Sequence, residues 1–214
     1  MSYSLYDLDT KMLKYLNYEN GFFIEAGAND GLSQSNTALY EFNKGWKGLL
    51  VEPNKIKSDQ CKVNRPNSIV ENYALVSKNY DGQTIRGNFN TNGHADSLTA
   101  MVCDDGDYDD QILSSHKKRL INSGDFIEVP ATTVDSLLKK HDIKTIDFFS
   151  LDVEGYEISV LNGMDLSACR PKYFLIEMNY DERKTSTIEY MESKNYKSLE
   201  YLTQNDCVFV DGNL

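Results

Sequence analysis

The sequence predicts an α/β fold in which a mostly parallel sheet carries helices on both faces and one antiparallel hairpin at its end. Short apolar runs alternate with segments of helical periodicity, which is the pattern of repeated strand–helix units. Most of these runs are apolar throughout, as expected of parallel strands that are buried on both faces. The last two runs, at 196–201 and 206–210, are close enough along the chain to pair as a hairpin.

The predicted elements follow one another in a regular order. Residues 3–18 predict a helix, because apolar residues recur at helical spacing from Leu5 to Leu16, and 1–20 is therefore an N-terminal helical segment. The expected strands lie at 21–25, 48–52, 69–76, 146–152 and 173–177. The helices expected after them lie at 35–43, 53–64, about 133–140, 154–162 and 186–193.

Residues 78–126 depart from this alternation. Glycine, asparagine and aspartate dominate the segment, and its periodicity is poor apart from a candidate helix at 112–121. A stretch of this length without regular structure is uncommon inside a compact domain and usually has a function. We therefore predict a single domain over residues 1–214 with a long loop or lid at 78–126.

Length and charge restrict the function. The chain has 214 residues, of which 40% are hydrophobic and 26% charged, and these values are ordinary for one globular domain. Its 22 basic and 33 acidic residues give a net charge of −11, which disfavours binding to nucleic acid or to an anionic membrane surface. No apolar run reaches the roughly 20 residues of a membrane-spanning helix, and the N-terminus lacks the pattern of a secretory signal.

The cysteines and histidines show no zinc-binding spacing. Because the four cysteines are far apart in the sequence, we expect reduced thiols and a cytoplasmic protein. The cysteines are Cys61, Cys103, Cys169 and Cys207.

Four predicted strands end in a carboxylate, and parallel strands bring their carboxyl ends to one edge of a sheet. The four residues are Glu25, Glu52, Asp152 and Glu177. Carboxylates are costly to bury unpaired, so this group indicates an edge that binds hydroxyl groups, a cation or a metal ion. The alternative is that each acid stabilises the N-terminus of the helix that follows it.

The loop after the first strand is the most specific feature. Residues 25–31 read Glu-Ala-Gly-Ala-Asn-Asp-Gly and join a strand to a helix, so their glycines allow the main chain to approach a ligand closely. The dinucleotide pattern Gly-x-Gly-x-x-Gly is absent, because Asn29 and Leu32 occupy two of its glycine positions. Glu52 follows this loop by 21 residues, the distance at which a carboxylate reaches a ribose diol. A ribose without a pyrophosphate, together with a cationic group near the first acid, describes S-adenosylmethionine.

Six segments in order extend this pattern. They are Phe-Ile-Glu-Ala-Gly-Ala-Asn-Asp-Gly at 23–31, Val-Glu-Pro-Asn at 51–54, Asn-Tyr-Ala-Leu-Val at 72–76, Thr-Val-Asp-Ser-Leu at 133–137, Asp-Phe-Phe-Ser-Leu-Asp-Val-Glu-Gly-Tyr-Glu at 147–157 and Ile-Glu at 176–177. Together they cover about residues 20–180, and in this order they resemble the FkbM-type methyltransferases, a branch of the class I S-adenosylmethionine-dependent enzymes.

The resemblance implies a Rossmann-like, seven-stranded methyltransferase sheet with strand order 3-2-1-4-5-7-6. It implies methyl transfer from S-adenosylmethionine, mostly to hydroxyl oxygens of sugars, glycolipids or polyketide-type products. The expected partner is thus a small-molecule or glycan acceptor, whose identity the sequence does not reveal. The sequence also leaves the oligomeric state open.

The resemblance also assigns residues to the cofactor. Glu25 and Gly27 are expected to flank the methionine part, although the family often has aspartate as this first acid. Glu52 is expected to bind the ribose hydroxyls, and Asn72 and Ala74 fall where the family places adenine. Ser97, in the long loop, is a candidate hydrogen-bond donor to the cofactor, with the cap of a turn as the alternative role. The whole expected cofactor-binding set is Glu25, Gly27, Asn29, Asp30, Gly31, Glu52, Pro53, Asn72, Ala74, Ser97 and Asp152.

Catalysis at a hydroxyl group needs a base or a metal ion, because a sugar hydroxyl is a poor nucleophile at neutral pH. Asp152 and Glu154 follow the fourth strand, and we expect one of them to act as the base or to bind the acceptor hydroxyl. The alternative for Glu154 is an acid at a helix N-terminus. His94, in the long loop, is a second candidate base, unless it is simply a solvated loop residue.

A divalent metal ion is a further expectation. Asp152, Glu177 and Asn179 offer oxygen atoms near two adjacent strand ends, and such ligands suit Mg²⁺ or Mn²⁺. The alternative is that these groups bind acceptor hydroxyls without a metal ion. Two other functions compete with methyl transfer: a nicotinamide-dinucleotide-dependent oxidoreductase, and a non-catalytic module that binds S-adenosylmethionine.

Overall fold

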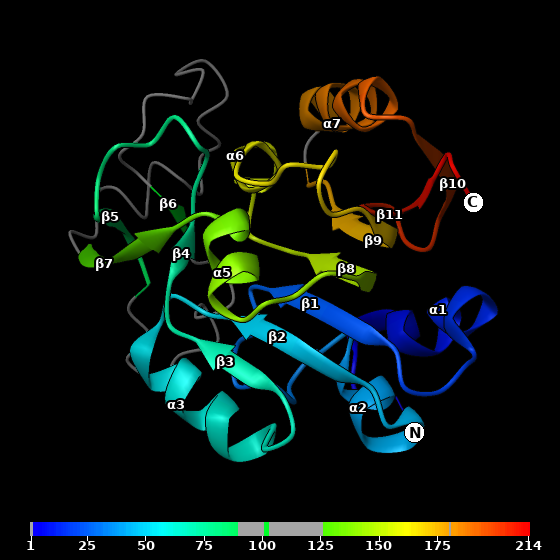
Figure 1. Cartoon of the computed structure of the whole chain (residues 1–214), viewed down its shortest axis with the longest axis horizontal. Coiled ribbons are helices and arrows are strands. Elements are labelled where there is room, and N and C mark those ends of the chain that lie inside the picture. Colours follow the sequence, from blue (N-terminus) through cyan, green and yellow to red (C-terminus); the bar gives the residue numbers. More distant parts are fainter. Residues whose placement is uncertain (1, 90–100, 103–125, 180) are drawn as a thin grey trace.

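The centre of the molecule is a seven-stranded, mostly parallel sheet with helices on both faces (Figure 1). The computed structural model describes residues 2–89, 101–102, 126–179 and 181–214. The strands lie side by side in the order β3–β2–β1–β8–β9–β11–β10. Their bounds are β1 (Phe22–Ala26), β2 (Lys47–Val51), β3 (Ile69–Glu71), β8 (Ile146–Leu151), β9 (Pro171–Glu177), β10 (Tyr196–Tyr201) and β11 (Asp206–Asp211).

Strand order and direction agree with the sequence-based prediction. Counted within this sheet alone, the strands follow the order 3-2-1-4-5-7-6. β11 runs antiparallel to β9 and β10, and the other neighbouring strands are parallel. In the register of the central strands, Ala26 pairs with both Val51 and Leu151, so β1, β2 and β8 end together at one edge.

The helices divide into two groups on opposite faces of the sheet, as Figure 1 shows. On one face lie η1 (Leu5–Asp7), α1 (Leu8–Leu16), α2 (Ala38–Lys44) and α3 (Lys55–Asn64). On the other lie α5 (Val134–Lys140), α6 (Glu157–Asn162) and α7 (Asp181–Ser193).

Each strand of the centre contributes to two hydrophobic cores, because successive side chains of a strand point to opposite faces. Phe23 and Phe148 belong to the core beneath α1, α2 and α3. Ile24 and Phe149, one position further along, belong to the core beneath α5, α6 and α7. This is why the strands are apolar throughout rather than alternating.

The predicted third strand, 69–76, is divided in the structure. β3 ends at Glu71, and β4 (Ala74–Leu75) pairs instead with β7 (Ile127–Thr132) in a second sheet of order β4–β7–β5–β6. The break coincides with Asn72, whose side chain binds the main chain of the neighbouring β2 loop. The sequence did not reveal this second sheet.

The 78–126 segment also differs from the prediction, because it contains β5 (Thr84–Asn88) and β6 (Met101–Val102). β5 pairs antiparallel with β7, and the alternation around its buried Ile85 is too short to stand out in the sequence. The candidate helix at 112–121, His94 and Ser97 lie outside the described residues.

Helix starts are set by side-chain caps that the sequence only partly reveals. The Oδ1 atom of Asn54 accepts hydrogen bonds from the main-chain nitrogens of Ile56 and Lys57, at 2.9 and 3.1 Å, and begins α3. Thr133 caps α5 in the same way. α2 begins three residues later than predicted, at Ala38, and the Oγ atom of Ser35 accepts from the main-chain nitrogens of Thr37 and Ala38 while it donates to Glu25.

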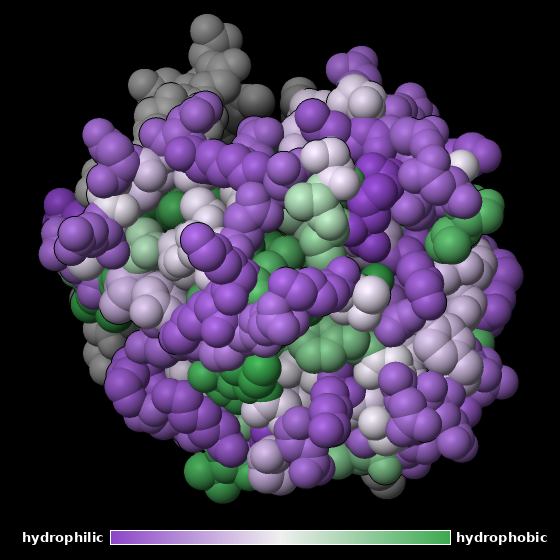
Figure 2. All heavy atoms as spheres, in the orientation of Figure 1, coloured by the Kyte–Doolittle hydropathy of each residue, from purple (hydrophilic) through white to green (hydrophobic). Residues whose placement is uncertain are grey.

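The surface and the thiols are ordinary. Figure 2 shows that hydrophobic residues on this face occur in small groups between hydrophilic ones, as on most proteins. Cys61, Cys169 and Cys207 are buried free thiols. Within the described part of the chain, the helices are too short or too polar to span a bilayer.

Candidate functional site

A cavity of about 310 Å³ opens where the central strands end. Its walls come from the ends of β1, β2, β8 and β9 and from the loops that follow β1, β2 and β8. This is the edge at which open α/β sheets bind ligands, and the volume suits a small organic molecule.

The turn after β1 forms one wall of the cavity. Gly27 has a φ angle of +82°, and a Cβ atom at this position would collide with the main-chain oxygen of Asp152 at the end of β8. Only glycine tolerates both the positive φ angle and the close main-chain contact without strain. The main-chain nitrogens of Gly27 and Ala28 donate to the oxygen of Val51, at 3.0 and 3.2 Å, so the turn is fixed against β2 as well.

The last two positions of the predicted turn have structural roles. The Asp30 carboxylate accepts hydrogen bonds from the main-chain nitrogens of Leu32 and Ser33, at 2.9 and 2.7 Å, and closes the turn. A Cβ atom on Gly31 would lie 2.7 Å from Cys61 Sγ, so this glycine permits close packing against α3. Among the described residues, Asp30 and Gly31 do not line the cavity, whereas Gly27 and Asn29 do.

Glu52 is held at the end of β2 with its carboxylate at the cavity. One carboxylate oxygen accepts from the main-chain nitrogen of Asn29 and the other from that of Asn54, each at 2.8 Å. Each oxygen keeps a further lone pair for a ligand. Burial raises the pKa of Glu52 to about 7, although these two hydrogen bonds oppose the shift. A carboxylate fixed in this way suits the adjacent hydroxyls of a ribose.

The two residues expected to contact adenine, Ala74 and Asn72, have different roles. Ala74 lines the cavity with its neighbours Tyr73 and Leu75, and Phe89 joins them. Asn72 does not line it in the described structure, because its amide nitrogen donates to the main-chain oxygens of Glu52 and Pro53, each at 2.8 Å. Asn72 therefore supports the Glu52–Pro53 turn from behind, which corrects the expected direct contact.

Glu25 also differs from the expectation of a free strand-end acid. It is buried, and its carboxylate accepts hydrogen bonds from Ser35, from the main-chain nitrogen of Asn36 and from Thr37. Arg65 lies 3.6 Å away as the nearest charge. Burial raises the pKa of Glu25, while Arg65 and the hydrogen bonds oppose that shift.

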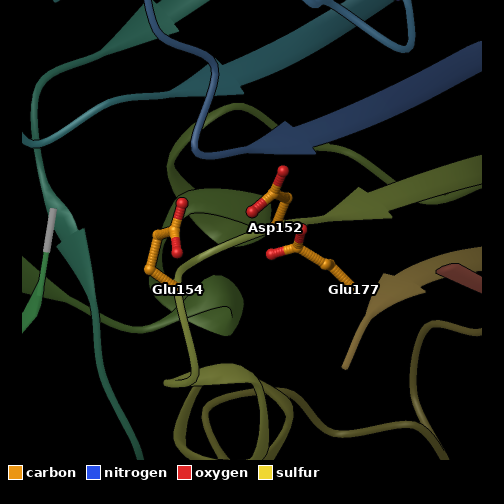
Figure 3. Close-up of side chains that lie close together, drawn as sticks. All are labelled: Asp152, Glu154 and Glu177. Carbon is orange, nitrogen blue, oxygen red and sulfur yellow. The ribbon is translucent and has the colours of Figure 1, made fainter. Parts of the chain in front are cut away.

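Three carboxylates meet beyond the Gly27 turn. Asp152 follows β8, Glu154 lies in the next loop and Glu177 ends β9, and their side chains point toward one another in Figure 3. One carboxylate oxygen from each lies within 4.8 Å of the others. Burial, followed by the charges of Glu177 and Glu154, raises the pKa of Asp152 well above its usual range. Burial, with Glu177 and Glu157 nearby, raises the pKa of Glu154 to about 8.

The predicted metal ligand Asn179 does not join this group. Its amide nitrogen donates to Glu177 at 2.7 Å, and its amide oxygen accepts from Asn205 at 2.9 Å. Asn179 thus orients Glu177, and its role as a metal ligand stays a prediction. Glu154, which the predicted ligand set did not include, is the third carboxylate of the cluster.

Glu154 reaches the cluster because the loop after β8 is sharply bent. Glu154 and Gly155 have φ angles of 56° and 94°. The carboxylate of Glu157 accepts from the main-chain nitrogens of Val153 and Gly155, at 3.3 and 2.8 Å, and holds this bend. Glu157, not Glu154, is the acid of the first turn of α6, so the helix-terminus alternative for Glu154 does not apply.

Residues near both ends of the chain complete the cavity, and no local sequence pattern predicts their place there. Leu5, Tyr6 and Leu8 line it from η1 and the start of α1, and Asp206 lines it from β11. Asp206 pairs with Glu177 in the antiparallel register, which brings it to the acidic edge. Tyr6 is 65% exposed and has a φ angle of 54°, an uncommon conformation for an aromatic residue.

The fold and the site define an α/β protein with a ligand-sized cavity at the carboxyl edge of its sheet, beside a group of acids. A family model described as "Methyltransferase FkbM domain" matches residues 25–198. The chain therefore belongs to the FkbM methyltransferase family, as the sequence motifs indicated, and is an S-adenosylmethionine-dependent methyltransferase.

Two solved structures are similar to the chain. One is described as a TehB-like SAM-dependent methyltransferase from Corynebacterium glutamicum, with 11% identity, a TM-score of 0.46, and coverage of 95% of this chain and 87% of that one. The other is described as human methyltransferase 10 domain containing protein, with 10% identity, a TM-score of 0.47, and coverage of 96% and 82%. No curated protein matches the sequence.

Proposed function

We propose that this protein transfers the methyl group of S-adenosylmethionine to a hydroxyl oxygen of a sugar, a glycan or a related small molecule, with the assistance of Mg²⁺ or Mn²⁺. The observation that carries the proposal is the group of Asp152, Glu154 and Glu177 beside the Gly27 turn. Family membership supports S-adenosylmethionine rather than a nicotinamide dinucleotide as the cofactor.

The geometry of the cavity fits the parts of this cofactor. Glu52 accepts hydrogen bonds with both oxygens and suits the ribose diol. Ala74, Leu75 and Phe89 provide an apolar wall for adenine beside it. The Gly27 turn lies between this wall and the acids, so the methyl group of a cofactor bound in this way faces Asp152 and Glu154.

The chemistry requires a single displacement at carbon. The acceptor oxygen attacks the methyl carbon from the side opposite the sulfonium sulfur. The C–O bond forms as the C–S bond breaks, and the hydroxyl proton passes to a carboxylate. In the site without a cation, Glu154 is suited to this role, because its pKa of about 8 lies near the working pH. Alignment of the two reactants accounts for most of the expected rate enhancement.

The donor set fits a divalent cation. Asp152, Glu154 and Glu177 offer oxygen atoms alone, the ligands that Mg²⁺ and Mn²⁺ prefer. Burial raises the pKa of all three, and the charge of Glu177 adds to the shift at Asp152 and Glu154, so a nearby cation would favour the ionised forms. A cation bound there would lower the pKa of the acceptor hydroxyl. His94 stays a proposed alternative base, and Ser97 a proposed cofactor contact.

The acceptor side of the cavity suits a hydroxylated ring. Tyr6 presents an exposed aromatic face, and aromatic faces pack against the apolar faces of sugar rings. Asp206 adds a further carboxylate that accepts hydrogen bonds from hydroxyl groups.

The proposal is tested with the purified protein in two stages. Calorimetry with S-adenosylhomocysteine measures cofactor binding. Incubation with S-adenosylmethionine and a panel of methyl glycosides, with MnCl₂ or with EDTA, then detects methylated products by mass spectrometry. We expect methyl ethers that disappear in Asp152→Asn and persist in the control Asp165→Asn, which alters a half-buried acid that does not line this cavity. Transfer to amines alone would contradict the acceptor class, and binding without transfer to any acceptor would favour a non-catalytic module.

A further inference from the structure

One buried polar atom of a cavity-lining residue has no partner among the described residues. Asn36 is 7% exposed and lines the cavity, and its buried Oδ1 atom forms no hydrogen bond within the part of the chain that the structure describes. Its Nδ2 atom donates to Ser150 Oγ on β8, at 3.0 Å. This contact holds the amide group of Asn36 against β8. An unpaired buried acceptor costs about 1–3 kcal/mol, and a ligand that donates a hydrogen bond removes this cost.

The position of Asn36 is set by an ionic network behind it. Its main-chain nitrogen donates to Glu25 at 2.7 Å, and the neighbouring Ser35 and Thr37 donate to the same carboxylate, with Thr37 at 2.6 Å. Glu25 lines the cavity too, but both of its oxygens already accept hydrogen bonds from within the protein. Asn36 Oδ1 is the neighbouring acceptor that has no donor among the described residues.

Arg65 completes this network from the C-terminal end of α3. It is fully buried, and its guanidinium donates to Gly31 O at 2.9 Å, to Ser35 at 3.1 Å and to Thr37 at 3.0 Å. It also pairs with the buried carboxylate of Glu41 at 2.7 Å. One planar cation thus ties the two ends of the segment 31–37, which carries Asn36, to α2 and α3.

The donors of the cofactor are few. The ribose hydroxyls have Glu52 as their acceptor, and the adenine ring packs against the apolar wall around Ala74. The ammonium group of the methionine part needs an acceptor at the other end of the cavity. Asn36 lies on the other side of the Gly27 turn from Glu52, next to β8, where the methionine part of the cofactor extends.

We infer that Asn36 Oδ1 accepts a hydrogen bond from the ammonium group of the cofactor, and that Glu25 and Arg65 are positioning residues that act through the segment 31–37. This inference rests on the proposed binding of S-adenosylmethionine in the cavity. The partner of the methionine part is then Asn36, in the loop after β1, and not the strand-end acid Glu25.

The test compares S-adenosylhomocysteine with its desamino analogue, which lacks only the ammonium group. Calorimetry gives both dissociation constants for each variant, at a temperature at which circular dichroism shows every variant folded. We expect wild type to bind S-adenosylhomocysteine at least tenfold more tightly than the analogue. Asn36→Ala should abolish this difference and leave the affinity for the analogue within about twofold. Asn36→Asp should keep the difference, because a carboxylate also accepts from an ammonium group.

The positioning residues should behave differently. Glu25→Gln and Thr37→Val should weaken both ligands by the same factor and speed hydrogen exchange of the amides in 31–37. Arg65→Lys should do the same, whereas Arg170→Lys, which alters another guanidinium–carboxylate pair remote from the cavity, should lower thermal stability alone. Thr37→Val retains the buried charges, so it tests the network even if Arg65→Lys does not fold.

The outcomes separate the two proposals. If Asn36→Ala keeps the preference for S-adenosylhomocysteine, or if Glu25→Gln alone abolishes it, the inference is wrong and the cofactor assignment stands. If wild type binds S-adenosylhomocysteine without preferring it to the analogue, the inference is also wrong. If wild type binds neither ligand, the proposed cofactor site itself is wrong.

Discussion

A methyl group on the α-carbon of Gly27 would overlap the main-chain oxygen of Asp152, so two strand ends touch at the centre of the site. We expect Gly27→Ala to abolish binding of S-adenosylhomocysteine, because the turn must move away from β8. Stability should fall by more than the roughly 1–2 kcal/mol of left-handed strain alone. Urea unfolding and calorimetry measure the two effects.

Gly45→Ala is the matched control for this prediction. Gly45 has a φ angle of +67°, but a Cβ atom there would lie 3.2 Å from Asn20 Oδ1, well outside the cavity wall. The free energy of unfolding should fall by about 1–2 kcal/mol, the cost of left-handed strain, and the ligand affinity should not change. Equal loss of affinity in both variants would contradict a specific role for the Gly27 turn.

Asn72 tests whether a residue supports the ribose site or binds adenine directly. Since its amide faces two main-chain oxygens, Asn72→Ala should weaken S-adenosylhomocysteine about tenfold, or about 1.4 kcal/mol. Asn72→Asp should be worse than alanine, because a carboxylate would face both oxygens. Affinity for adenosine, which retains the base and the ribose, should fall in parallel. An aspartate variant with wild-type affinity would show that the amide has no supporting role.

Glu52 should make the unliganded protein less stable as pH rises. Its pKa is about 7 in the folded protein and about 4.5 in the unfolded chain, so the folded state binds the proton more tightly. Its contribution to stability is fully present below pH 4.5, falls as pH rises, and is lost above pH 7. Urea unfolding from pH 5 to 8 should show that wild type loses stability relative to Glu52→Gln.

Glu200→Gln is the control for the pH profile. Glu200 pairs with Lys14, which lowers its pKa, so its titration affects stability only below about pH 4.5. Its curve should therefore run parallel to wild type over this window. Parallel curves for wild type and Glu52→Gln would contradict the raised pKa.

The acidic cluster should bind Mn²⁺ through Asp152, Glu154 and Glu177. Electron paramagnetic resonance of the free ion should show that Glu154→Gln and Glu177→Gln each weaken binding at least tenfold. Asn179→Ala should have a smaller effect, because that side chain orients Glu177 and offers no free oxygen. Retention of wild-type Mn²⁺ affinity in both glutamine variants would refute this ligand set.

Tyr6 should affect the acceptor and not the cofactor. Once an acceptor has been found, Tyr6→Ala should raise its KM several-fold and leave the affinity for S-adenosylhomocysteine unchanged. Tyr6→Phe retains the aromatic face and should resemble wild type. A phenylalanine variant as impaired as alanine would point to the hydroxyl group instead of the ring.

The sequence was sufficient for features that depend on local pattern. Runs of apolar residues identified the central strands β1, β2 and β8, because burial on both faces favours apolar side chains at successive positions. Parallel strands end at one edge, so the positions of Glu52, Asp152 and Glu177 in the chain already placed them together. The role of Gly27 could be predicted from the sequence, because few residues other than glycine tolerate a positive φ angle and a close approach of two main chains.

The sequence was less informative about sheet membership. The run at 69–76 was read as one strand, but Asn72 divides it, and Ala74 continues in a second sheet. A hydrogen bond from a side chain to a distant loop has no period, so hydrophobic pattern does not report it. The sequence pattern does not predict β5 for a similar reason, since its partner β7 lies about 40 residues away along the chain.

Only the tertiary structure decided what each polar group at the edge faces. It directed Glu25 toward Arg65 and the segment 31–37, left the oxygen of Asn36 without a partner among the described residues, and put Glu154 in the acidic cluster. It also brought Tyr6 and Asp206, from the two ends of the chain, to one cavity. The spacing of residues fixes where a side chain leaves the backbone. Which donors and acceptors surround it depends on elements remote in the sequence, and those meet only when the chain has folded.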